Sequence, residues 1–163
     1  MLRGVEAHLG SEQVSRVIYG AIIGMALVVS LEAHPPGPAV VATTLVATAL
    51  AVALAEFYSE VIGTQTRLRR RVERHHLRHI FEHVAAVAFG IVFPDVFFFL
   101  AALGLMEVDT AFTVAKWTGL GLIAFYGFSA GRLAGESRTR ALLQALAVTA
   151  IGGALIAFKA IVH

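Results

Sequence analysis

Long apolar stretches divide this sequence, and they decide what the chain can fold into. A helix that crosses a lipid bilayer needs about 20 mostly apolar residues, within a range of about 17–25. Five stretches reach this length, and they cover residues 17–33, 39–62, 80–105, 111–131 and 141–162. Charged residues make up 15% of the chain, whereas a soluble domain carries about 25%. The sequence therefore predicts an all-α integral membrane protein in which residues 1–163 form a single transmembrane domain with five spanning helices.

Basic residues alternate between the loops that connect these stretches. Arg3 and Arg16 precede the first stretch, six arginines follow the second, and three more, Arg132, Arg138 and Arg140, follow the fourth. The loops after the first and third stretches contain no lysine or arginine. Because short loops rich in these residues stay in the cytoplasm, we predict a cytoplasmic N-terminus and an outside C-terminus. We expect the chain in the plasma (inner) membrane of a prokaryote.

The cytoplasmic segment at residues 64–80 is the most basic part of the chain. Six arginines lie between Arg67 and Arg78. Beside long apolar stretches, such arginines orient the helices and bind anionic lipid headgroups. We therefore expect membrane lipids, and not nucleic acid, as the partner of this segment. The chain contains no cysteine, which excludes disulfides and thiolate metal sites.

Histidines are concentrated in the same segment. His75, His79 and His83 are spaced so that they share one face of a helix, and Glu82 lies beside them. Imidazoles four residues apart can chelate a divalent ion such as iron, manganese or zinc, and a carboxylate can complete the site. The alternative is an amphipathic extension of the third span, with its imidazoles at the depth of the lipid headgroups. The spacing leaves both interpretations open and specifies no other cofactor.

Four acidic residues lie within or at the ends of the predicted spans: Glu32, Glu56, Glu60 and Asp95. Ionisable groups inside a membrane are costly and usually face a bundle interior or water. Glu56 lies inside the second span and Asp95 follows Pro94 near the middle of the third, so these two are the strongest candidates for a transport or proton site. Glu60 and Glu32 could instead extend to water at the membrane interface. Asp95 could instead cap the half-helix that follows Pro94.

Glycines recur at intervals of four in two of the predicted spans. Gly20 and Gly24 form one pair, and Gly127 and Gly131 form another. Small residues at this interval let membrane helices approach closely. The pairs predict a tight bundle and are compatible with a homodimer.

Several of these residues, taken in order, resemble the vacuolar iron transporter family. Gly20, Ala21 and Gly24 match the Gly-Ala-x-Asp-Gly stretch of the family's first span, and Glu56 and Ser59 match Gly-Glu-Tyr-x-Ser at the end of its second. The last two predicted spans are similar to the family's C-terminal pair, with small residues, a short basic loop and a glycine-rich span. The resemblance is distant but covers most of the chain.

The resemblance implies five spans, an inside N-terminus, an outside C-terminus and a first span used in dimerisation. This chain departs from the family at two places. Ile23 occupies the position of the first-span aspartate, which serves as a metal and proton site in the family. A stretch of about eighteen residues, rich in arginine and histidine, stands where the plant and yeast members place a metal-binding helical domain. The fold can carry over to this chain, whereas iron transport does not follow from the fold alone.

The leading hypothesis is a transporter that exports a divalent metal ion, similar to iron or manganese, from the cytoplasm. The histidines and Glu82 would collect the ion, and Glu56, helped by Asp95, would accept it or a proton moving the other way. A carboxyl group suits this role because burial favours its neutral form and a nearby cation favours its charged form. On this hypothesis Glu56→Gln abolishes metal efflux. The alternative is a non-transporting helical subunit or scaffold of a larger membrane complex. No nucleophile–base set is recognisable, so we do not expect an enzyme.

Overall fold

The structure is a computed structural model, and it describes residues 11–68 and 74–162. The protein is all-helical over these residues. No strand occurs within these two ranges. The helices are α2 (Ser11–Leu31), α3 (Pro38–Leu68), α4 (Arg74–Val92), α5 (Asp95–Ala102), α6 (Val108–Leu133) and α7 (Arg138–Val162). The predicted helical fold is therefore confirmed for this part of the chain.

Three of the helices, α2, α3 and α7, are long and apolar enough to cross a membrane. The third predicted span is broken into α4 and α5, which together would make a fourth crossing with a bend of 50°. Helix α6 has 26 residues, but Asp109, Lys116 and its glycines and threonines lower its hydropathy, and it is not among the candidate spans. The helices are thus compatible with a membrane protein of three to four spans, and the fifth span stays a prediction.

Prolines and glycines set the ends of the helices. Residues 32–37 separate α2 from α3, and Pro38 begins α3, a position where the missing N–H of proline costs nothing. Gly104 and Gly135 follow α5 and α6 with φ angles of 75° and 78°. In both cases backbone N–H groups bond back to carbonyls of the last turn, which is the usual glycine termination of a helix. Pro94 interrupts the third span because proline cannot continue the helical hydrogen bonds.

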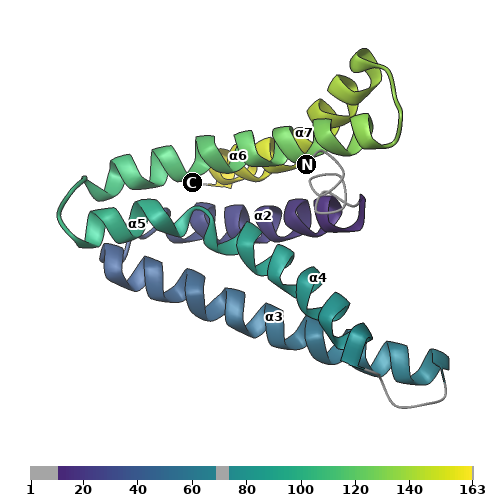
Figure 1. Ribbon diagram of the computed structural model, residues 1–163. Coiled ribbons are helices and arrows are strands. Elements are labelled where there is room, and N and C mark those ends of the chain that lie inside the picture. Colours follow the sequence, from purple (N-terminus) through teal and green to yellow (C-terminus); the bar gives the residue numbers. More distant parts are fainter. Residues whose placement is uncertain (1–10, 69–73, 163) are drawn as a thin grey trace.

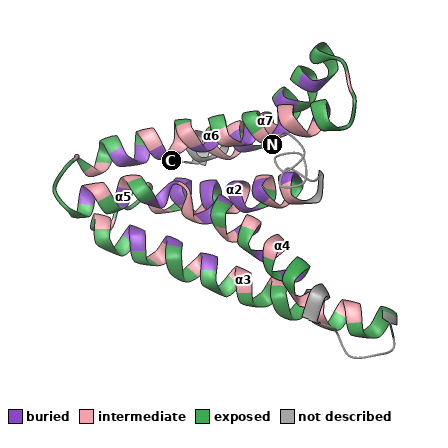
Figure 2. Ribbon diagram, viewed as in Figure 1, coloured by how far each residue is buried: buried purple, intermediate pink, exposed green. Residues whose placement is uncertain are grey.

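Helix α2 occupies the centre of the bundle (Figure 1). It packs against α4 on one side and against α6 on another, while α3 packs on α4 and α5, and α7 packs on α6. Figure 2 shows that buried positions recur along α2, whereas α3 is mostly exposed. In the spanning part of α2, 44% of residues are buried, against 22% in α3 and 17% in α7. Helices α3 and α7 therefore present broad apolar faces outward.

The largest apolar core joins α2, α3, α5 and α6 near the ends of these helices that lie beside α5. Phe98 and Phe112 are fully buried there and pack edge to face, with ring centroids 4.8 Å apart. Val28 and Leu45 belong to the same cluster. This core anchors α5, so that the break before it has a fixed position in the bundle.

Glycines lie where the helices cross most closely. At the crossing of α2 and α4, a Cβ on Gly20 would lie 2.1 Å from the carbonyl oxygen of Val87, and one on Gly90 would lie 2.5 Å from the oxygen of Val17. Gly24 meets the same helix at Ile91. Gly127 and Gly131 lie in the same way against Ala145 and Ala141 of α7. Both predicted glycine pairs therefore pack helices within one chain.

Candidate functional site

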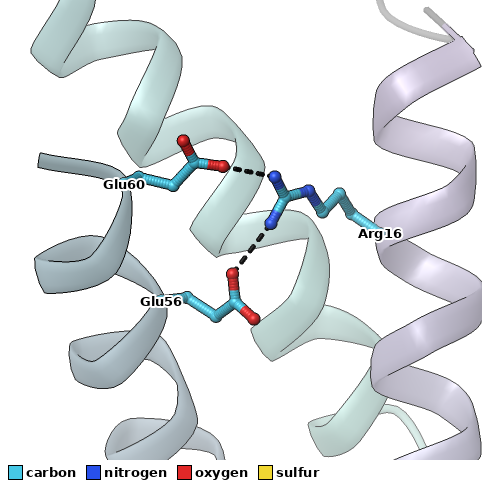
Figure 3. A network of polar contacts seen from close by, with 3 residues as sticks. All are labelled: Arg16, Glu56 and Glu60. Atoms are coloured by element: carbon cyan, nitrogen blue, oxygen red, sulfur yellow. Dashed lines mark hydrogen bonds and ion pairs between the residues drawn. The ribbon is translucent and has the colours of Figure 1, made fainter. Parts of the chain in front are cut away.

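Two of the predicted acidic candidates share one arginine. Arg16 reaches from α2 to α3, where its Nη1 lies 2.8 Å from Oε2 of Glu56 and its Nη2 binds Oε1 of Glu60 (Figure 3). Glu56 and Glu60 are one helical turn apart, so both carboxylates project from the same face of α3. The three side chains are about a quarter exposed. One guanidinium thus joins two carboxylates, and the group keeps a net negative charge.

This ion-paired group connects two helices that make few direct contacts, because α4 packs against both of them. The role of Arg16 was missed in the sequence, where it counted only toward the basic side of the membrane. A signal did exist, since Arg16 and Glu60 lie at the same end of two neighbouring antiparallel spans. The pairing changes the interpretation of Glu56, because a cation or proton would have to compete with Arg16 for its carboxylate.

Glu32 is also paired. Its Oε1 lies 2.6 Å from Nζ of Lys116, so the end of α2 is tied to α6. Both side chains are about one-fifth exposed. The lysine that lowers the hydropathy of α6 therefore has a carboxylate partner directly after the last residue of the central helix, which compensates for its placement among apolar residues.

Asp95 differs from the other three acidic residues because no basic side chain among the described residues forms an ion pair with it. It is the first residue of α5, and only 6% of its surface is exposed. It lies on the same face of α5 as the buried residues Phe98 and Ala101. Its Oδ1 is buried without a hydrogen-bond partner among the described residues. The N-cap position of α5 belongs to Pro94, so Asp95 lies in the first turn, where the helix dipole favours negative charge.

A shallow hollow of about 230 Å³ opens beside Asp95. Its other walls are apolar and come from Val92, Val96, Phe99 and Leu100. The carboxyl group is thus the polar element of an otherwise apolar hollow at the break between two helices. Discontinuous membrane helices with an ionisable group at the break are a recurring form of ion-binding and substrate-binding site.

The predicted histidine site lies on the exposed part of α4. Oε1 of Glu82 accepts a hydrogen bond from Nε of Arg78 at 3.1 Å, and its other oxygen lies 3.8 Å from Nδ1 of His79. His79 is largely exposed, and His83 is intermediate. Among the side chains that the structure describes, no group of three or more histidines, aspartates or glutamates could hold a metal ion. The side chain of His75 lies outside the described residues, so the set of four stays a prediction.

Comparisons with protein-family models, with curated proteins and with solved structures found no match. The resemblance to the vacuolar iron transporter family therefore stays a prediction.

Proposed function

We propose that this chain is a five-span membrane carrier that exchanges a cation for a proton at Asp95. The observation that carries the proposal is the buried carboxyl group of Asp95, which lies at the break between α4 and α5 without a basic partner among the described residues. An unpaired carboxylate is costly inside a membrane, and such a group is retained where an ion visits it.

The exchange follows from the charge of the site. In the absence of a cation, the apolar surroundings favour the neutral carboxyl group, which holds a proton. A cation that enters the hollow favours the carboxylate, so the proton leaves Asp95 and passes to water. When the cation departs, a proton returns. Each cycle thus moves one cation against the one proton that Asp95 holds, so exchange of a monovalent cation is electroneutral, whereas exchange of a divalent cation carries one net positive charge across the membrane.

The resemblance adds a cargo and a direction to this scheme. It favours a divalent metal, iron or manganese, exported from the cytoplasm of a prokaryote, with anionic lipids around residues 67–78. A homodimer would use the exposed faces of α3 or α7, because the glycines of α2 already pack against α4. In this scheme Glu56 has a structural role and does not bind the transported cation, since Arg16 is paired with its carboxylate.

Replacement of Asp95 by asparagine tests the exchange directly. The purified chain is placed in vesicles that contain a pH-sensitive dye, and Mn²⁺ is added outside. We expect Mn²⁺-driven proton flux from the wild type, and flux equal to that of empty vesicles from Asp95→Asn, because the amide cannot release a proton. Asp109→Asn is the matched control, since Asp109 lies in the first turn of α6 but is exposed.

Wild-type flux in Asp95→Asn would remove the proposal. Glu56→Gln separates this scheme from the mechanism predicted from the sequence. We expect Glu56→Gln to keep its flux in the present scheme, whereas loss of flux would return Glu56 to the role of acceptor.

Single cysteines test the five spans and their orientation, because the chain has no cysteine of its own. Gly37→Cys lies between α2 and α3, Leu105→Cys between α5 and α6, and Ser137→Cys between α6 and α7. We expect a membrane-impermeant maleimide to label the first two from outside intact cells and the third only after the cells are opened. Equal labelling of Leu105→Cys and Ser137→Cys from one side would show that α6 does not cross the membrane.

A second candidate function is a non-transporting scaffold or subunit of a larger membrane complex. Two ion-paired groups, Arg16 with its glutamates and Lys116 with Glu32, tie α2 to its neighbours. The broad apolar faces of α3 and α7 would then contact partner helices instead of lipid. This function predicts no flux in any variant and a stable complex with another membrane protein after mild solubilisation.

A further inference from the structure

An apolar groove of about 490 Å³ runs along α4 on the side that faces α3. Three phenylalanines, Phe81, Phe89 and Phe93, contribute to its walls, together with Ala53 of α3. Phe89 and Phe93 lie with their ring centroids 5.9 Å apart. The volume falls in the range of about 300–1,000 Å³ that is usual for small-molecule sites.

The groove and the hollow beside Asp95 adjoin each other. Val92 and Val96 line both of them. A molecule that lies along the groove therefore passes from aromatic and aliphatic walls to a carboxyl group at the helix break. Phe99 adds a further aromatic ring on the Asp95 side.

An apolar groove that ends at a carboxyl group suits some ligands better than others. A lipid chain or a second copy of the apolar helix face would fill the groove but would leave the carboxyl group unpaired. A cation with apolar substituents satisfies both parts, because its charge meets the carboxylate while its substituents cover the groove. Aromatic faces also attract such cations, and the attraction grows when water is excluded. A divalent metal could meet the carboxylate but would leave the apolar groove empty, and no group of three or more potential metal-ligating side chains lies among the described residues.

We propose that the groove between α3 and α4 binds a lipophilic organic cation whose charged centre lies at Asp95. The inference rests on the proposed function and adds to the divalent metal a second class of cargo, an amphipathic monovalent cation such as a quaternary ammonium or phosphonium. Binding converts the protonated carboxyl group of Asp95 to the carboxylate and releases one proton to water. The cation enters sideways from the membrane, since the groove is open and its walls are apolar.

Tetraphenylphosphonium and tetraphenylborate test this directly, because they have nearly the same shape and opposite charge. Binding to the full chain in lipid nanodiscs is measured by equilibrium dialysis, and proton release is followed in weak buffer. We expect tetraphenylphosphonium to bind with release of one proton, and tetraphenylborate not to compete. Asp95→Asn should weaken binding by roughly tenfold or more and abolish the proton release, whereas Asp109→Asn should change neither.

A second pair of variants tests whether the phenylalanines of the groove contribute to binding. Phe89→Ala should weaken binding by about three- to thirtyfold. Phe125→Ala should have no effect, because Phe125 is also exposed but lies on α6 away from the groove. Asp95→Glu keeps the carboxyl group and should retain proton release, which provides a test if the asparagine variant does not fold.

The inference is overturned if Asp95→Asn binds tetraphenylphosphonium as the wild type does, or if tetraphenylborate competes equally, as a groove for lipid chains would allow. It is also overturned if Phe89→Ala leaves binding unchanged but dissociates a dimer, since a second copy would then cover the groove. Mn²⁺-driven proton flux without phosphonium binding overturns it and leaves the proposed exchange intact. Phosphonium binding with proton release but no flux of any cation overturns the proposed carrier and leaves the binding site.

Discussion

Gly20→Ala is expected to destabilise the protein by about 3 kcal/mol, the upper end of the usual cost of overpacking, because the neighbouring atoms cannot move aside. The new Cβ would lie 2.1 Å from the carbonyl oxygen of Val87 and 2.9 Å from its carbonyl carbon. Both atoms belong to the backbone of α4, so no side-chain rotation relieves the contact. Helices α2 and α4 would have to separate, and the central helix would lose its closest neighbour.

Gly121→Ala is the matched control for this substitution. Gly121 also lies inside a helix, α6, but nothing surrounds its Cβ position within 4 Å. Alanine there should stabilise the helix by roughly 0.5–1 kcal/mol, because it restricts the unfolded chain more than glycine does. The midpoints of thermal and SDS-induced unfolding measure both effects. Equal stability of the two variants would show that α2 and α4 do not approach as closely as described.

Arg16→Leu is expected to cost about 1–3 kcal/mol, a value between those of exposed and fully buried ion pairs. The substitution leaves Glu56 and Glu60 on the same face of α3 without their cation. Each carboxylate then repels the other, and both are only about a quarter exposed to solvent. The SDS concentration that unfolds half of the protein should fall, and Arg67→Leu, which removes an exposed arginine from the end of α3, should leave it nearly unchanged.

A combined variant distinguishes two causes of the lost stability, which are repulsion between the unpaired carboxylates and loss of the packing of the arginine side chain. If repulsion between the carboxylates causes the loss, Glu56→Gln with Glu60→Gln should restore most of the stability of Arg16→Leu. The same pair of substitutions should destabilise the chain when Arg16 is present. Additive effects in all combinations would mean that the three side chains do not interact.

The helices could be predicted because each apolar stretch carries its own signal. The stretches around residues 17–33, 39–62 and 141–162 appear as α2, α3 and α7, although α2 begins six residues earlier and α3 ends six residues later than predicted. Pro94 also predicted a break, although the size of the bend depends on how α5 packs against Phe112. The fourth stretch, residues 111–131, appears as α6, and its membrane crossing stays a prediction; the partner of its Lys116 is Glu32, which lies 84 residues away and gives no local signal.

The candidate site was predicted only in part, because pairing between helices leaves no periodic signal in a sequence. Glu56 and Glu60 were identified from their positions within the second predicted span. Their pairing with Arg16 depends on how α2 and α3 pack around α4. Asp95 was identified from Pro94, whereas its burial and its apolar surroundings depend on the packing of α5. The glycine spacing predicted close contact, and the structure provides the partner helices, which belong to the same chain.

Infrared difference spectroscopy can detect directly whether the carboxyl group of Asp95 exchanges a proton for a cation. Spectra of the protein in nanodiscs are recorded with and without tetraphenylphosphonium, and with and without Mn²⁺. We predict that at least one of the two cations removes the C=O band of one protonated carboxyl group and adds a carboxylate band, and that Asp95→Asn lacks this change while Asp109→Asn retains it. A wild-type spectrum unchanged by either cation, or the same band loss in Asp95→Asn, would contradict the exchange at Asp95.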